Sequence, residues 1–464
     1  MSPRVHFTRA AGAAVLWAAT ALAMIACSRD QLLEVNTPDQ ITTTSIASPA
    51  GAQAQRVAAI GNFARFFAGD IGGGGIGLNL TTAILADEAY TARSGTEHLD
   101  SRAQNPNSFP ANAPWSPFGA AYNDIVRGIR ALNKYPPAGS AAATQVGQLY
   151  MLDGFTFTLM GESYCNGIPV SDVNDNSPKT TTFSTTDLYN RALSVFDSAL
   201  TTLSTSSTDQ PYRLAARVGK ARTYVDLNQY DKAAAILGAG GDGAGSAAVP
   251  TTFTYNAEYS NSTALSVNDV YDWMLATKNF GASDKEGGNG LDYVSSKDPR
   301  IGVDGTKVGP GQDGTPTPLM LQFPNTNSPV ALASGIEARL IEAENSLKNG
   351  DIAGYLAGLN AARATKASLT PLTDPGDATS RINTLFRERA FWMYFTSHRL
   401  GDMRRLIRQY GRGTETVFPT GPYIHGGVYG TEVVLVPAQT ELNNPNWGGP
   451  GATDPKKVCT DMKA

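Results

Sequence analysis

The chain has 464 residues, 41% of them hydrophobic, which is enough to build a large core in one or two domains. Charged residues make up 17%, the formal net charge is −4 and no basic tract stands out, so nucleic-acid binding has no electrostatic basis. The 4 histidines and 3 cysteines form no His-Glu-x-x-His pattern and no close Cys/His cluster. The sequence therefore predicts no metal site and no cofactor.

Residues 1–26 have the pattern of a secretory signal peptide. Arg4 and Arg9 supply a positive start, and residues 10–26 form a mostly apolar, alanine-rich run that is shorter than the roughly 20 residues of a bilayer span. The run ends at Cys27, directly after the small Ala26. This ending is similar to a bacterial lipobox, in which the cysteine is acylated and becomes the mature N-terminus. We predict a lipid anchor at Cys27; the alternative is an ordinary signal peptide with an incidental cysteine.

Helical periodicity dominates the rest of the chain. After Ser184 and Thr185, either of which could cap a helix, apolar residues recur every three or four positions. They are Leu188, Ala192, Val195, Phe196, Ala199, Leu200 and Leu203. Similar patterns predict helices over residues 149–160, 212–227 and from Tyr230, a helical hairpin over 336–362, and a helical stretch over 379–410. Small residues where paired helices would cross are typical of tetratricopeptide-type hairpins.

Glycine-rich and polar segments separate these helices. They cover residues 238–252, 281–290, 302–318, 411–430 and 443–455 and are predicted as loops. None is long enough to suggest a separate domain, and helical hairpins lie on both sides of them. We therefore expect a mainly α fold with tetratricopeptide-like hairpins and long loop insertions, in a single domain over residues 27–464.

Two cysteines remain if Cys27 is acylated. Cys165 and Cys459 would then be an even pair in an oxidising compartment. We predict a disulfide between them, and the alternative is two unpaired thiols.

Catalytic patterns are mostly missing. The run Gly72–Gly75 lacks the lysine and the spacing of a phosphate-binding loop and is predicted to be a flexible turn. The chain contains no Gly-x-Ser-x-Gly motif. Asp87 and Glu88 could serve as an acid/base pair, but adjacent carboxylates on a helix point about 100° apart. A binding protein is the favoured interpretation, and a hydrolase that uses Asp87, Glu88 or another carboxylate pair is the alternative.

Aromatic residues in loops suggest a binding surface. Flat aromatic rings suit the apolar faces of sugar rings. Trp115 follows a proline-rich segment, Tyr271 and Trp273 lie in an acidic patch, and Tyr293 follows a glycine-rich loop. Each could instead anchor its own loop, whereas Trp392 is predicted to belong to the core.

Several short motifs, in order along the chain, are similar to the SusD/RagB family of surface lipoproteins. Cys27 is followed by an acidic residue, an aliphatic segment and Pro38, and residues 161–162 (Gly-Glu) precede 168–170 (Ile-Pro-Val) with an insertion between them. The C-terminal matches are residues 340–344 (Leu-Ile-Glu-Ala-Glu), 357–363 (Ala-Gly-Leu-Asn-Ala-Ala-Arg), 387–405, 436–441 (Val-Pro-Ala-Gln-Thr-Glu) and 443–445 (Asn-Asn-Pro).

The resemblance implies a function outside the cell. Such a protein would be lipid-anchored in the outer membrane, exposed at the cell surface, and would deliver oligomeric nutrients to a SusC-like TonB-dependent β-barrel transporter without altering them. Glycans are the first expectation for the ligand and peptides, as in a RagB-like receptor, the second. A third possibility is an envelope scaffold that binds only proteins.

The segment 387–405 is rich in charge. Glu388, Arg399, Asp402 and Arg405 can pair at spacings of three or four residues, as Arg399 and Asp402 would. We interpret them as structural ion pairs that hold a helix against its neighbours; the alternative is a cationic ligand site.

Overall fold

The structure is a computed structural model that describes residues 47–70, 75–105, 107, 109–139, 141–170 and 181–443. The chain divides into two units between Ser48 and Pro49, and every helix and strand given below lies in the second. The predicted signal peptide, Cys27 and Cys459 lie outside the described residues, as do residues 71–74 of the predicted glycine turn. No helix in the described ranges is both long and apolar enough to cross a bilayer.

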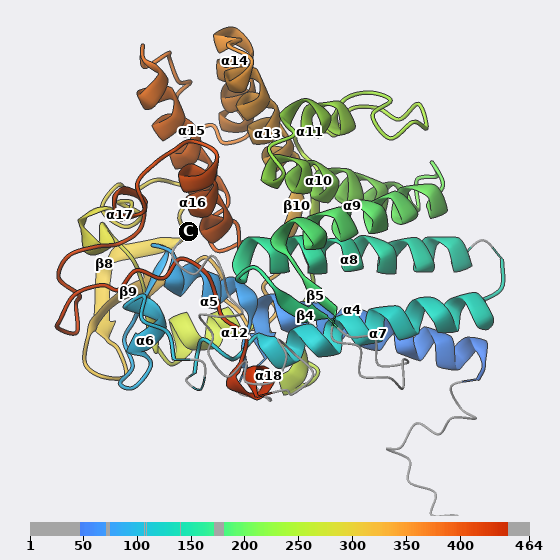
Figure 1. Ribbon diagram of the computed structural model, residues 1–464, viewed down its shortest axis with the longest axis horizontal. Coiled ribbons are helices and arrows are strands. Elements are labelled where there is room, and N and C mark those ends of the chain that lie inside the picture. Colours follow the sequence, from blue (N-terminus) through green and yellow to red (C-terminus); the bar gives the residue numbers. More distant parts are fainter. Residues whose placement is uncertain are drawn as a thin grey trace, which may run out of the picture. The chain divides into compact units, whose positions relative to one another are not determined.

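Helices stack one against the next through most of the second unit (Figure 1). Successive packing partners are α4 (Pro49–Ala68), α7 (Trp115–Lys134), α8 (Ala141–Ser163), α9 (Thr185–Thr202), α10 (Gln210–Asp226), α11 (Tyr230–Leu237), α13 (Gly335–Lys348) and α14 (Ile352–Arg363). Shorter helices are α5 (Leu78–Leu85), α6 (Glu97–Asp100), α12 (Asp269–Tyr271), α17 (Thr414–Val417) and α18 (Gln439–Leu442). The mainly α fold with helical hairpins is confirmed.

The start of α9 follows from its sequence. The Ser184 side chain accepts a hydrogen bond from the backbone N–H of Asp187 at 3.1 Å, and the Asp187 carboxylate accepts one from the Ser184 N–H at 3.0 Å. This capping box satisfies two N–H groups that the helix itself cannot pair. Such a cap is worth about 1 kcal/mol, and it selects Ser184 over Thr185 as the first boundary residue.

The predicted helical stretch over 379–410 is wrong, because the chain turns in the middle of it. Helix α15 (Ala378–Trp392) and helix α16 (Arg399–Arg408) are separate. Between them, Phe395 and Ser397 have φ of 55° and 64°, which no helix contains. The Asn79 side chain donates to the Phe395 carbonyl at 2.6 Å, and the Glu88 carboxyl accepts from the Phe395 N–H at 3.1 Å. Asn79 and Glu88, which are far away in the sequence, therefore stabilise the turn between α15 and α16.

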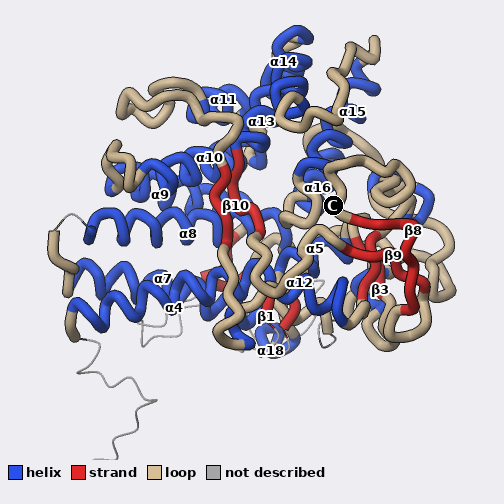
Figure 2. Tube along the Cα trace, turned by 180° about the vertical axis from the view of Figure 1, so that it is seen from behind, coloured by secondary structure: helices blue, strands red, loops and turns tan. Residues whose placement is uncertain are grey.

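Strands are short and pair two by two within the described residues. The antiparallel pairs are β1 (Gly69–Asp70) with β2 (Gly75–Ile76), β4 (Ile168–Val170) with β5 (Thr181–Phe183), β6 (Thr254–Ala257) with β10 (Val330–Ser334), β3 (Ala89–Thr91) with β7 (Phe280–Ala282), and β8 (Val303–Pro310) with β9 (Pro316–Met320). Strands β3, β8 and β9 gather on one side of the stacked helices (Figure 2).

The hairpin β8–β9 corrects the prediction of a loop over residues 302–318. Its tip closes with the Asp313 side chain accepting from the Thr315 N–H at 2.8 Å and with Gly314 at φ 91°. Glycine, proline and aspartate therefore mark the turn and the edges of this hairpin rather than an irregular loop.

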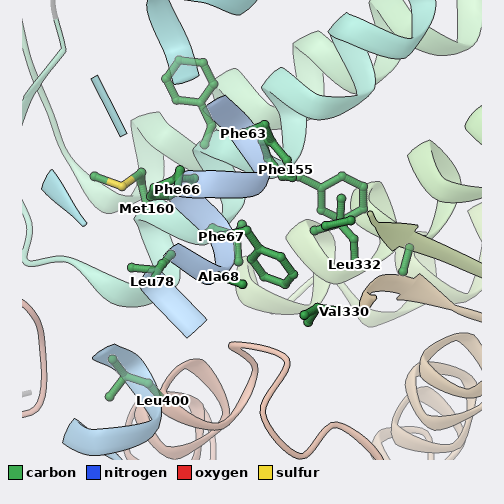
Figure 3. Close-up of a cluster of buried hydrophobic side chains, with 14 of the residues drawn as sticks. Phe63, Phe66, Phe67, Ala68, Leu78, Phe155, Met160, Val330, Leu332 and Leu400 are labelled. Atoms are coloured by element: carbon green, nitrogen blue, oxygen red, sulfur yellow. The ribbon is translucent and has the colours of Figure 1, made fainter. Parts of the chain in front are cut away.

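The main core lies where α4 meets α8 and the first strands. Phe63, Phe66 and Phe67 of α4 point among Phe155 and Met160 of α8, together with apolar residues of other elements (Figure 3). Burying one phenylalanine side chain contributes about 1.5–3 kcal/mol. A second cluster joins α13, α14 and α15, and the half-buried Trp392 packs against it.

Candidate functional site

Trp115 lies in the core and not on the exposed loop that the sequence suggested. It is the first residue of α7, its side chain is buried, and its ring centroid lies 5.2 Å from that of Tyr164 and 5.7 Å from that of Phe118. The proline-rich segment before it leads straight into a helix, where proline is compatible with the first turn. In this structure its ring faces protein.

Tyr293 is also buried, with 1% of its surface exposed. Its ring centroid lies 4.9 Å from that of Tyr394 and 5.2 Å from that of Phe391, and its hydroxyl donates to Asp87 at 3.4 Å. Its position after a glycine-rich segment reflects docking of that segment onto α15, which corrects the expectation of an exposed ring.

Tyr271 and Trp273 are half-buried at α12 and the π-helical turn Asp272–Ala276 that follows it. The Trp273 ring centroid lies 5.1 Å from that of Phe109, and its Nε1 donates to Asp269. The four predicted aromatics therefore do not converge on one surface. Whether Tyr271 or Trp273 contacts a ligand stays a prediction.

The carboxylates of Asp87 and Glu88 are buried and engaged by protein groups. Asp87 binds Arg399 through both oxygens, while burial raises the pKa of Glu88 to about 8 despite the hydrogen bond from Phe395. Neither carboxylate is therefore accessible to a substrate from solvent. The contacts favour a structural role for both.

The charged segment forms buried ion pairs, as interpreted, although with different partners. Asp402 binds Arg389 and Arg405 at 2.8 Å each. Glu388 binds Arg300 and Arg363 at 2.7 Å each. The predicted pairing of Arg399 with Asp402 is wrong, because Arg399 turns to Asp87 instead.

Cys165 is fully buried and is disulfide-bonded. Cys459 lies outside the described residues. The pairing of these two cysteines stays a prediction, which peptide mapping under non-reducing conditions would test.

A cavity of 570 Å³ opens beside the strand pair β3–β7 and the adjoining strand β9, and we call it the tyrosine cavity. Its lining includes three tyrosines (Tyr90, Tyr423, Tyr429) and three prolines (Pro316, Pro318, Pro422). Val308 and Ile424 also line it, and they are 57% and 58% exposed. A concave, largely apolar site of this volume with a few polar groups is typical of a small-molecule binding site.

Tyr90 is positioned by a glycine on the neighbouring strand. Tyr90 of β3 is paired with Gly281 of β7, and any side chain at position 281 would overlap the tyrosine ring. The Tyr90 hydroxyl donates to the Pro316 carbonyl on β9. The half-buried ring is therefore held against β7 and β9, and it lines the cavity.

Tyr423 and Tyr429 come from a tight turn in the glycine-rich segment 411–430. The Tyr423 N–H donates to the Gly427 carbonyl and the Tyr429 N–H to the Gly421 carbonyl, both at 3.1 Å. Gly427 has φ 77°, which suits the tip of such a turn. The centroids of the two tyrosine rings lie 5.1 Å apart, with 72° between the ring planes. Only 7% of Tyr423 and 9% of Tyr429 is exposed, so the two rings form a wall of the cavity and leave little ring surface on which a ligand could stack.

Beneath this wall lie two carboxyl groups. Tyr423 donates to Asp100 at 2.9 Å and Tyr429 donates to Glu286 at 3.0 Å. Burial raises the pKa of both carboxyls, and the pKa of Glu286 is raised further by the charge of Asp100. The raised pKa of each carboxyl favours its neutral form. The hydrogen bonds from Tyr423 and Tyr429 tie the turn to these two carboxyl groups.

The lining of the tyrosine cavity contains Asp284 and Glu286 and no lysine, arginine or histidine. The described residues contain no cluster of three potential metal ligands. The chemistry offered here is contact with an apolar face, plus a few oxygen acceptors for hydroxyl or amine donors.

Sequence reasoning missed Tyr90, Tyr423 and Tyr429. A signal was present in residues 421–429, where two tyrosines flank a Gly-Gly pair and each stands one or two positions from a proline or glycine. That pattern is typical of a tight turn that carries ordered rings.

Comparisons with known proteins identify the fold. No family model and no curated protein matches the sequence. Matching solved structures include SusD superfamily proteins from Parabacteroides distasonis (12% identity, TM-score 0.63, 88% of this chain and 98% of that one) and Bacteroides fragilis (15%, 0.62, 85% and 97%). Another is a SusD-like carbohydrate binding protein from Bacteroides vulgatus (13%, 0.57, 77% and 83%). The chain therefore has the SusD-like fold.

Proposed function

We propose that this chain is a SusD/RagB-family lipoprotein that binds oligosaccharides at the cell surface in its tyrosine cavity. The observation that carries the proposal is the cavity itself, with the Tyr90 ring beside exposed apolar side chains and the exposed carboxylate of Asp284. Sugar rings present apolar C–H faces edged by hydroxyl groups, so this mixture of contacts suits them. The fold shared with a protein named as carbohydrate binding supports the same ligand class.

The proposed mechanism is passive. The cavity holds an oligosaccharide, and the protein passes it to a SusC-like TonB-dependent β-barrel transporter, with no covalent step. The lipid on Cys27 would keep the binding domain at the outer membrane, since each buried methylene contributes about 0.8 kcal/mol and several acyl chains anchor a protein durably. Peptides remain the second ligand class, because the apolar wall and the acceptors also suit amide-containing chains.

A hydrolase remains the rival function, and the contacts of Asp87 and Glu88 argue against it. Both carboxylates are buried and bound by protein groups from α16 and the turn before it. An enzyme would need a carboxylate that reaches its substrate.

The test is incubation of the purified mature protein with panels of oligosaccharides and peptides, followed by mass spectrometry of the bound and free fractions. Retention of intact oligosaccharides supports the proposal. Retention of peptides alone would show that the ligand is a peptide and would contradict oligosaccharide binding. Cleaved products that accumulate with time would overturn the passive mechanism.

A further inference from the structure

A second cavity, of 550 Å³, adjoins the tyrosine cavity, and we call it the neighbouring cavity. The two share Asp284, Val294 and Gly305 in their linings. Both volumes fall within the roughly 300–1,000 Å³ typical of small-molecule sites. Two ligand-sized hollows thus meet at a boundary made of three residues.

Hydrogen bonds hold the boundary in place. Asp284 Oδ1 accepts hydrogen bonds from the N–H of Val294 at 3.0 Å, the N–H of Ser295 at 2.8 Å and the Ser295 hydroxyl at 3.0 Å. These bonds pin the turn after Tyr293 to the end of β7. Asp284 itself is exposed, and its Oδ2 has no hydrogen-bond partner among the described residues. Gly305 on β8 has no side chain to raise the boundary.

The linings on either side differ in chemistry. The tyrosine cavity is walled by aromatic, proline and aliphatic groups. The neighbouring cavity has a mixed lining, in which the polar Lys297, Asp298 and Thr306 stand beside apolar residues such as Ile301 and Val303. Asp298 is bound by Arg300 at 2.7 Å, whereas the exposed Lys297 has no partner among the described residues. The first cavity therefore suits an apolar ring face, and the second adds an exposed cationic donor for hydroxyl groups beside its own apolar contacts.

We infer that the two cavities are consecutive subsites of one groove, which an oligosaccharide occupies by crossing the boundary at Asp284, Val294 and Gly305. This rests on the proposed function. An oligomer long enough to cross gains a second, intramolecular set of contacts, so its affinity exceeds that of a fragment that fills the tyrosine cavity alone. Hydrogen bonds from Lys297 and to the unpartnered oxygen of Asp284 would hold the polar end.

The experiment is isothermal titration of the mature protein with neutral malto-, cello-, xylo- and manno-oligosaccharides, each from disaccharide to octasaccharide. In the series that binds, the dissociation constant should fall by roughly 10- to 100-fold once the chain crosses the boundary. Lys297→Ala should weaken binding of long chains only. Lys134→Ala removes another exposed lysine, at the end of α7, and should change the binding of neither short nor long chains.

A blocking variant tests the boundary directly. Gly305→Phe places a ring at the boundary, where its Cβ would crowd Val294, and should remove the advantage of long chains. A circular-dichroism spectrum and a thermal unfolding midpoint equal to those of wild type show that the variant is folded. Should length bring no gain, or should Lys297→Ala weaken short and long chains equally, the second subsite is overturned while oligosaccharide binding stands. If no length of any series binds, both proposals fail.

Discussion

Arg399 on α16 donates two parallel hydrogen bonds to the carboxylate of Asp87, which lies 312 positions earlier in the sequence. Its Nε lies 2.6 Å from Oδ1 and its Nη2 lies 2.8 Å from Oδ2, and both side chains are buried. The N–H of Leu291 also donates to Oδ2 at 3.0 Å. The pair therefore joins three segments that are far apart in the sequence: the turn after α5, the segment between β7 and β8, and α16.

Asp87→Asn should destabilise the protein strongly. The substitution leaves the Arg399 guanidinium buried without a counter-charge, which typically costs about 3–5 kcal/mol. The measurement is the free energy of unfolding from urea titration at neutral pH. Asp374→Asn is the matched control, because Asp374 also binds an arginine (Arg381) through both oxygens, yet in solvent. Its effect should be small, and equal losses for the two variants would refute the structural role of Asp87.

Glu88 gives the stability of the protein a definite pH dependence. Burial raises its pKa from 4.5 to about 8, so the folded state favours the neutral carboxyl. This contribution is complete below pH 4.5 and is lost as the pH rises through 8. Glu88→Gln mimics the neutral form and should gain stability relative to wild type by up to about 1.4 kcal/mol per pH unit in that interval. The measurement is the free energy of unfolding of both proteins at pH 5 and pH 8. The same difference between variant and wild type at both pH values would contradict the prediction.

Much of the helical fold was predictable because the apolar spacing and the capping residues of a helix lie within its own segment of sequence. The stripe from Leu188 to Leu203 and the serine at 184 define α9 without reference to other elements. The break between α15 and α16 was not predictable, because the positive φ values at Phe395 and Ser397 depend on Asn79 and Glu88, more than 300 positions away. Tertiary contacts override helical periodicity there.

The candidate site was harder to predict for a related reason. The sequence shows which aromatics stand near glycine and proline, but burial decides which of them face a ligand. Trp115 and Tyr293 look like loop residues and are buried, whereas Tyr90 sits on a short strand opposite Gly281 and borders the cavity. That pairing joins positions 90 and 281, which are far apart in the sequence, so the residues around either position could not predict it.

The Tyr90 ring should carry a measurable share of ligand binding. Tyr90→Ala removes the ring and should weaken oligosaccharide binding by roughly tenfold, which corresponds to about 1.4 kcal/mol. Tyr90→Phe keeps the ring and loses only the hydrogen bond to Pro316, so its affinity should stay close to that of wild type. Calorimetric titration measures both. An alanine variant that binds as wild type does would remove Tyr90 from the site.

The lipid anchor predicted at Cys27 has a direct test. Cys27→Ala removes the acylated thiol, so the protein should leave the membrane fraction and appear in the soluble fraction of the cell envelope or the medium. Fractionation followed by immunoblotting gives the readout. Membrane retention of the variant equal to that of wild type would contradict a lipid on this residue.

The most direct test of the binding site is a crystal structure of the mature protein soaked with the oligosaccharide that binds it most tightly. We predict electron density for a sugar ring against Tyr90 and Ile424, in the tyrosine cavity. Density at another place, such as the polar cavity lined by Glu162, Asp226 and Arg404, with the tyrosine cavity free of sugar, would contradict the account.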